Sequence, residues 1–202
     1  SRQSVYIPYS GSELQSRTEC YWKVNVVTNK GDNIWSEPSR WSVALLDSTD
    51  WSATWIGMDR FFDGEILDTL YTRLTARYLR KEFSLEKPVK KAVLYISGMG
   101  LYEPWINGAR IGTQVLAPTP TDYMKRVCYN VFDVTDALVE GDNAIGVVLG
   151  NGRFFSMRKG TASPDMKHFG FPKMVMQLEV MYGDGSTKTI VSDESWKLTG
   201  NG

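Results

Sequence analysis

The sequence has 202 residues, 42% of them hydrophobic, and its 23 basic residues balance its 23 acidic residues to a formal net charge of zero. This length allows one or two domains with ordinary hydrophobic cores. The charge balance argues against the basic surface that neutralises nucleic-acid phosphates, and the apolar stretches are far shorter than the roughly 18 residues of a membrane-spanning helix. We therefore predict no nucleic-acid partner and no membrane span.

Three strands are expected near the start of the chain, over 5–9, 18–28 and 41–46. In the middle one Cys20, Trp22, Val24 and Val26 alternate onto one face, which is the period of a half-buried strand. The chain opens with SRQSVYIPYS, without a start methionine or an apolar signal segment, and reads as the middle of something longer. This end therefore carries no information on secretion.

The spacing of Leu14, Thr18 and Cys20 resembles the corner before a late strand of a fibronectin type III domain, where a tyrosine stands at the position of Cys20. On this resemblance residues 1–46 are the C-terminal part of such a β-sandwich. A complete sandwich of this kind needs about 100 residues. We therefore expect its early strands upstream of Ser1, and an exposed sheet edge in this chain.

Residues 47–57 are expected to link two domains. Asp47 and Asp50 are turn formers, while Trp51 and Trp55 supply aromatic anchors. These anchors favour a docked linker over a loose one.

The segment 58–202 is predicted to be an antiparallel, jelly-roll-like β-sandwich, which makes the whole chain all-β. From Tyr78 onward short strand-like runs follow one another at near-regular spacing, with glycine, aspartate and asparagine turns between them. Asn107 and Gly108 favour a tight hairpin turn with two positive φ angles, and residues 183–185 predict a second hairpin. Only 134–140 looks helical, for about two turns.

The two cysteines, Cys20 and Cys128, each lie in an apolar run and in different predicted domains. Free cysteine usually behaves as a small buried hydrophobe. We expect two buried thiols and no disulfide.

Catalytic chemistry is hard to find in the sequence. The single histidine, His168, lies in a loop-like stretch without GxSxG, HExxH, Walker or GxGxxG patterns around it, so we assign it a solvated-loop role. Glycoside hydrolysis needs two facing carboxyl groups, one of them kept protonated, and no such pair can be discerned. We predict no catalytic residue in this chain.

Several motifs in order, DSTDW, ATWIG, LYEPWINGARIG, PTPTDY and GNGRF, resemble the N-terminal region of bacterial α-L-rhamnosidases. The resemblance covers almost the entire chain. It implies a non-catalytic accessory region, mainly structural and domain-orienting, of a glycoside hydrolase that releases terminal α-L-rhamnose. In that family the acid and base come from a downstream (α/α)6 barrel that inverts the anomeric carbon, and the enzymes act in the periplasm or outside the cell.

Some members of the family use this sandwich as a calcium-dependent rhamnose-binding module. Glu103, Asp122 and Asn151 are the candidate oxygen donors for sugar or calcium, and Arg153 joins them as a candidate sugar contact. Each also has a local explanation: Asp122 as a turn cap, Asn151 in a left-handed turn, Glu103 in solvent. Where relatives read PGWTDY and GNGWY, this chain has Pro120 and Arg153 in place of tryptophan, which removes a potential stacking platform.

The long segment between GNG and Lys173 carries Arg153, Arg158, Lys159 and Asp165. Loops of roughly 20 residues are unusual in compact domains and tend to be functional or disordered, so we expect this one to reach a neighbouring catalytic domain. Three hypotheses stay open: an accessory region that orders an α-L-rhamnosidase, a rhamnose-binding module, and an adhesion module without enzyme activity.

Overall fold

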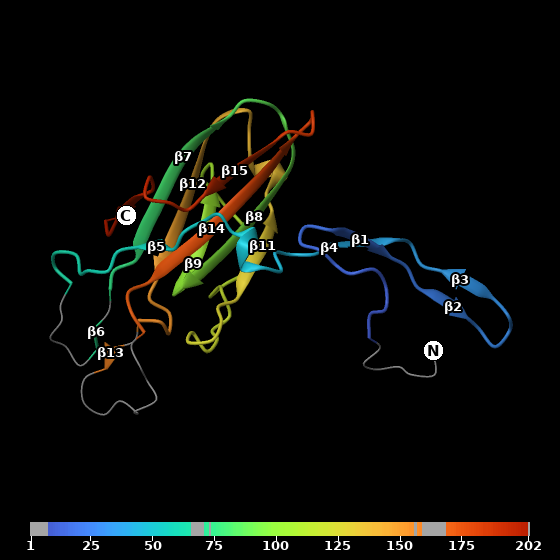
Figure 1. Ribbon diagram of the computed structural model, residues 1–202. Helices are drawn as coiled ribbons and strands as arrows, with labels where there is room; N and C mark the ends of the chain where they lie inside the picture. Colours follow the sequence, from blue (N-terminus) through green and yellow to red (C-terminus); the bar gives the residue numbers. More distant parts are fainter. Residues whose placement is uncertain (1–7, 66–70, 73, 156, 159–168, 202) are drawn as a thin grey trace. The chain divides into compact units, whose positions relative to one another are not determined.

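The computed structural model describes residues 8–65, 71–72, 74–155, 157–158 and 169–201, with the backbone alone at 71–72 and 157–158. The chain divides into two compact units, Ser1–Trp51 and Ser52–Gly202, which are traced in Figure 1. The division lies inside the predicted linker.

Unit 1 contains two short antiparallel ribbons. Strand β1 (Glu19–Trp22) pairs with β4 (Ser39–Ser42), and β2 (Asn25–Val27) pairs with β3 (Asn33–Trp35). The expected strand over 18–28 is therefore two strands. They are separated at Val24, whose N–H donates to Ser36 Oγ and whose carbonyl accepts from the Ser36 N–H. Pro38, two residues further on, has no backbone N–H to donate.

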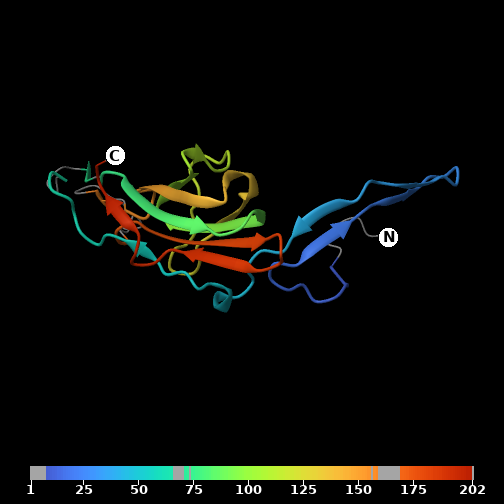
Figure 2. The ribbon, with the colours of Figure 1, turned by 90° about the horizontal axis from the view of Figure 1, so that it is seen from above.

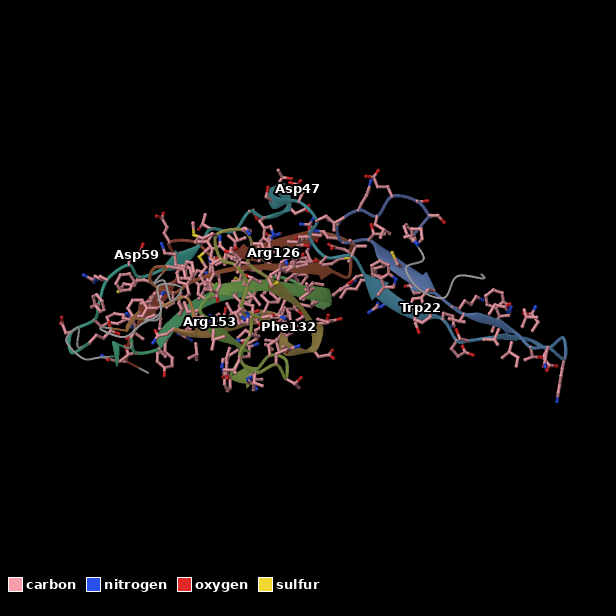
Figure 3. All side chains as sticks on the ribbon, turned by 90° about the horizontal axis from the view of Figure 1, so that it is seen from below. Trp22, Asp47, Asp59, Arg126, Phe132 and Arg153 are labelled. Atoms are coloured by element: carbon pink, nitrogen blue, oxygen red, sulfur yellow. The ribbon has the colours of Figure 1, made fainter. Side chains whose placement is uncertain are left out.

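The apolar face predicted for unit 1 exists but is not covered within the described part of the unit. Among its side chains Trp22, Val26, Ile34 and Trp35 are each about half exposed, whereas Val43 and Leu45 are buried. The expected strand 41–46 ends at Ser42, and of 5–9 only residues 8 and 9 are described, outside any strand. Trp22 and the turn residue Asp47 are labelled in Figure 3.

Unit 2 is a sandwich of two antiparallel sheets. One sheet has the order β10-β9-β12-β7-β16 and the other β11-β8-β14-β15, with β5 added to β14. In Figure 2 β14 and β15, in orange and red, lie in one layer, and green β7 lies in the other. A separate pair outside the two sheets is formed by β6 (Tyr71–Thr72) and β13 (Met157–Arg158). The strands of the two sheets are β5 Ile56–Gly57, β7 Arg77–Leu85, β8 Val89–Met99, β9 Leu101–Ile106, β10 Ala109–Arg110, β11 Tyr129–Asp133, β12 Gly141–Gly150, β14 Lys173–Tyr182, β15 Thr187–Val191 and β16 Lys197–Thr199.

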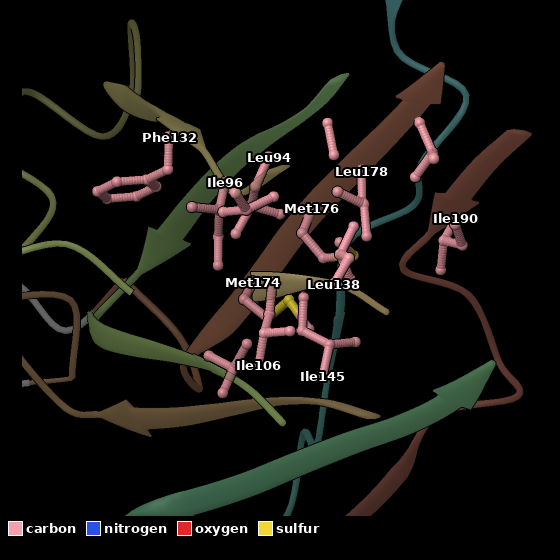
Figure 4. Close-up of a cluster of buried hydrophobic side chains, with 14 of the residues drawn as sticks. Leu94, Ile96, Ile106, Phe132, Leu138, Ile145, Met174, Met176, Leu178 and Ile190 are labelled. Carbon is pink, nitrogen blue, oxygen red and sulfur yellow. The ribbon is translucent and has the colours of Figure 1, made fainter. Parts of the chain in front are cut away.

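The core fills the space between the two sheets. Along β12 every second side chain is buried, from Asn143 through Ile145 and Val147 to Leu149, as the alternating sequence requires. Ile145 faces the same interior as Leu94 and Met176 of the opposite sheet (Figure 4). The chain is thus all-β, with about 3% helix, and the predicted fold class is confirmed.

The beginning of unit 2 is docked on a sheet. The Ser52 N–H donates to Gln177 Oε1 of β14 (2.8 Å), and the Thr54 N–H donates to the Ser192 carbonyl (2.9 Å). The Ser192 hydroxyl donates a hydrogen bond of 2.6 Å to the Thr54 carbonyl. Gln177 and Ser192 are both buried, so this segment supplies hydrogen-bond partners to buried polar groups of the sheet.

The predicted hairpin turns are confirmed. Asn107 and Gly108 have φ angles of 50° and 83° and join β9 to β10. Gly185, with φ of 84°, lies in the turn between β14 and β15. Both φ angles of the first turn are positive, as the Asn-Gly pair predicts.

Two further local predictions are wrong. Instead of a helix over 134–140 there is one 3-10 turn, η2 (Thr135–Ala137), because the Asn143 side chain bonds to both the N–H and the carbonyl of Val139 and draws the chain into an extended path. Both cysteines are free, as expected, but Cys128 is exposed and Cys20 only partly buried.

Candidate functional site

Two aromatic clusters gather at one end of the unit 2 sandwich. Tyr123, Phe154 and Phe169 form the first, with ring centroids 5.3 to 5.9 Å apart. The second consists of Phe61, Phe155 and Phe171, with centroids 5.1 to 6.2 Å apart. Because Phe154 and Phe155 are adjacent in the chain, the two clusters tie the loops after β5, before β11 and after β12 into one surface, which we call the aromatic end.

A buried ion pair supports the aromatic end. The side chains of Arg77 and Glu65 are 1% and 2% exposed, and Arg77 Nη1 and Nη2 bond to both oxygens of the Glu65 carboxylate. The ring of Phe62 lies 4.3 Å from the guanidinium carbon. Burial alone would raise the pKa of Glu65, but hydrogen bonds from Arg77, Thr75 and the Phe62 N–H outweigh it and hold the pKa at about 2.

Asn151 lies at the aromatic end and is partly buried. Its Nδ2 donates to the Leu74 carbonyl (3.0 Å), and its own carbonyl accepts from the Phe155 N–H (3.2 Å). Its Oδ1 is buried without a hydrogen-bond partner among the described residues. The positive φ expected here belongs to the following residue, Gly152, at 53°.

Arg153 and Asp122 also lie at the aromatic end. Arg153 acts electrostatically on Tyr123, and Asp122 precedes Tyr123 in the chain. Burial raises the pKa of the Tyr123 phenol, and the positive charge of Arg153 opposes that shift, which places the guanidinium within electrostatic reach of the ring. Asp122 is a turn former: its Oδ1 accepts from the Met124 N–H (3.2 Å), and its Oδ2 lies 3.3 Å from Lys125 Nζ. The local explanation for Asp122 is confirmed.

Glu103 does not lie with the other candidates. It is on β9, with its side chain 47% exposed, and its Oε1 lies 3.4 Å from Arg110 Nη2 of β10. The structure thus brings together Asp122, Asn151 and Arg153 but directs Glu103 toward the neighbouring hairpin strand. Sequence reasoning missed Tyr123 and Phe154, although both occur within the quoted motifs TPTDY and GNGRF.

The described part of the chain has neither a metal-binding cluster nor a membrane-spanning helix. It contains no group of three or more histidine, cysteine, aspartate or glutamate side chains able to hold a metal ion, and no helix in it is long and apolar enough to cross a membrane. His168, Lys159 and Asp165 lie outside the described residues, and the side chain of Arg158 is not described either.

The fold and the site define an all-β module of two units, in which the candidate carboxylates Glu103 and Asp122 contact neighbouring residues. Residues 87–202 match the α-L-rhamnosidase N-terminal domain family, and residues 1–47 match the Rha78A-like N-terminal immunoglobulin domain. The chain therefore belongs to the α-L-rhamnosidase N-terminal domain family.

Relatives and solved structures agree with this membership. An α-L-rhamnosidase of Formosa agariphila is 35% identical over 98% of this chain. The structure of the α-L-rhamnosidase from Dictyoglumus thermophilum is 40% identical and superposes with a TM-score of 0.80 over 96% of the chain, and that from Aspergillus terreus is 35% identical with a TM-score of 0.83 over 98%. The chain spans 22%, 22% and 23% of these three proteins and corresponds to an N-terminal segment of its relatives.

Proposed function

We propose that this chain is a non-catalytic accessory region of an α-L-rhamnosidase, which orders a multidomain enzyme that releases terminal α-L-rhamnose. The observation that carries the proposal is coverage: relatives with that name match 98% of this chain with only 22% of their own length. An (α/α)6 catalytic domain downstream in the same polypeptide, and a periplasmic or extracellular location, belong to the proposal.

The titration of the carboxylates supports a non-catalytic role. An inverting glycosidase needs a carboxylic acid whose pKa is raised, opposite a carboxylate about 6.5–9.5 Å away. Among the described carboxyl groups, each resolved pKa shift is downward, caused by hydrogen bonds from neighbouring groups that in Glu65 and Asp193 outweigh burial. Such groups stay ionised at neutral pH and cannot protonate a leaving group.

The aromatic end supports an ordering role. Two ring clusters and the buried Arg77–Glu65 pair make it a rigid surface, and Arg153 stands on it as an exposed cation. A fixed charge on a rigid surface can select one orientation of a neighbouring domain, since electrostatic complementarity fixes register more than it adds affinity.

The proposal is tested first by activity. The 202-residue chain should show no hydrolysis of 4-nitrophenyl α-L-rhamnopyranoside, and the longer polypeptide translated from the same gene should hydrolyse it. Activity of the 202-residue chain, or a longer product that encodes no helical barrel, would contradict the proposal. The second outcome would favour an adhesion module.

The ordering role is tested by Arg153→Glu in the longer polypeptide. We expect a lower thermal midpoint or a lower kcat/KM than in the parent. Arg80→Glu is the matched control, because Arg80 is equally a surface arginine, 56% exposed in an ion pair on β7. If Arg153→Glu leaves both quantities unchanged, the aromatic end does not orient the enzyme.

A second function, calcium-dependent rhamnose binding at the aromatic end, is favoured by the buried Asn151 Oδ1 without a described partner. Amide oxygens are suitable calcium ligands, and Asp122, which precedes Tyr123 of the first aromatic cluster, would be a second donor. This function predicts L-rhamnose binding that a chelator abolishes and that Asn151→Ala weakens. Binding that is insensitive to both would remove it.

A further inference from the structure

A concave site lies on unit 2, and none of the residues of the two aromatic clusters lines it. It is a pocket of about 320 Å³ between β5 with the start of β14 on one side and β16 with its preceding turn on the other. This volume is near the lower end of the range for small-molecule pockets, about 300–1,000 Å³, so the pocket suits a single compact ligand. None of Asp122, Asn151 and Arg153 lines it.

The floor of the pocket is apolar and fixed. Trp196 is 8% exposed, and its indole Nε1–H donates to the Val191 carbonyl at 3.0 Å. Leu79, which is 2% exposed, lies beneath the pocket. Gly57 allows β5 to approach β14 closely, because a Cβ there would lie 2.5 Å from the Pro172 carbonyl oxygen.

One wall is an exposed indole. Trp55 is 39% exposed, and no described residue accepts a hydrogen bond from its Nε1. Its backbone is held in place from the preceding residue, since Thr54 exchanges bonds with Ser192 at 2.9 and 2.6 Å. The backbone beside the indole is therefore held before any ligand arrives, which reduces the entropic cost of binding.

The rim is polar and carries both signs of charge. Asp59 Oδ2 and Lys173 Nζ form an ion pair of 2.8 Å, in which the Asp59 side chain is exposed and the Lys173 side chain is partly exposed. Asp59 is labelled in Figure 3. Glu194 is exposed and has no interaction with another described residue. Asp193 is already engaged by Lys81 at 2.7 Å and by Ser195, so it serves structure.

We propose that this pocket binds one neutral saccharide residue without a metal ion. An indole face suits the C–H face of a sugar ring, and carboxylates beside an ammonium group can accept from and donate to neighbouring hydroxyls at once. The residues that line the pocket include three carboxylates and one lysine, which disfavours a phosphate or another anion. The site stands on unit 2 alone and does not depend on the proposed role of the region in an enzyme.

The test is a calorimetric titration of the 202-residue chain with methyl α-L-rhamnopyranoside, with methyl α-D-glucopyranoside for comparison, each with and without a chelator. A probe of about 12 non-hydrogen atoms should bind with a dissociation constant on the order of millimolar, unchanged by the chelator. Trp55→Ala should weaken binding by about 10-fold, and Glu194→Gln should weaken it by about 3-fold because one charge-assisted hydrogen bond becomes neutral. Trp22→Ala, which removes a 52% exposed indole from unit 1, is the matched control and should change nothing.

Three results would overturn the proposal. The first is no binding of either glycoside, and the second is binding that Trp55→Ala and Trp22→Ala affect equally. The third is binding by the 202-residue chain that disappears in the longer polypeptide, because a segment of the protein itself would then fill the pocket. Loss of catalytic activity in the longer polypeptide would affect only the proposed enzyme role.

Discussion

Replacing Glu65 with glutamine is expected to destabilise unit 2 strongly at neutral pH. The change leaves Arg77 charged and 1% exposed, with only neutral partners, the Thr75 hydroxyl and the carbonyls of Thr75 and Arg60. Removing one partner of a buried ion pair costs about 3–5 kcal/mol. Because glutamine still accepts one hydrogen bond, we expect the lower end of this range.

The lowered pKa of Glu65 expresses the same ion pair as a pH dependence of stability. A pKa of about 2 in the folded chain, against 4.5 ordinarily, corresponds to about 3 kcal/mol of folding free energy at neutral pH. Since the folded pKa is the lower one, this contribution is complete above about pH 5 and is lost as the pH falls toward about 2. The gap between parent and variant should therefore close in acid.

The assay is thermal unfolding followed by calorimetry across this pH range. For a domain of this size about 3 kcal/mol corresponds to a midpoint lowered by about 6–12 °C at neutral pH. Glu82→Gln is the control, because Glu82 is 59% exposed in its ion pair with Arg80 and should cost less than about 1 kcal/mol. Equal midpoints for Glu65→Gln and the parent at neutral pH, or a gap that stays constant into acid, would refute the reasoning.

Two further substitutions test the fold in urea unfolding. Asn107→Ala should cost about 3 kcal/mol, because Asn107 has a φ of 50° and its side chain bonds to the Ala144 N–H (2.9 Å) and the Ala137 carbonyl (3.0 Å); a cost below that of an ordinary surface change would show that the turn does not depend on these bonds. Tyr102→Phe should cost about 1–2 kcal/mol, because it removes a buried hydroxyl that lies 3.0 Å from the Ile96 carbonyl. Tyr78→Phe, at a ring 37% exposed, should cost nothing, and equal effects of the two tyrosine changes would contradict the second prediction.

The strands and turns of unit 2 were largely predictable because their signals are local. The alternation of apolar and other residues along β12 predicts which side chains face the core. The Asn107-Gly108 pair predicts a turn because both residues favour positive φ angles. The helix predicted over 134–140 does not form because a residue outside that range competes for its backbone. The Asn143 side chain hydrogen-bonds to the N–H and the carbonyl of Val139. A propensity weighed over seven residues cannot include such a partner.

The candidate site was less predictable for a related reason. Sequence periodicity assigns a residue to a face but does not say which distant segment will meet it. Glu65 and Arg77 are separated by a stretch without a clear motif, yet they form the buried ion pair of unit 2. The docking of Ser52 on Gln177 likewise joins residues 125 positions apart.

The contacts of the acidic residues show why a sequence predicts more ligand-binding carboxylates than the folded chain has available. Asp122 accepts from the backbone of its own turn, Glu103 faces Arg110, and Asp193 is engaged by Lys81. Each of these acids has its acceptor capacity partly consumed by a neighbour, so binding a sugar hydroxyl would require breaking a bond already made. Glu194 carries no such cost among the described residues and stands beside an exposed indole. Glu194, which no sequence motif singles out, is therefore the carboxylate whose surroundings best suit a ligand.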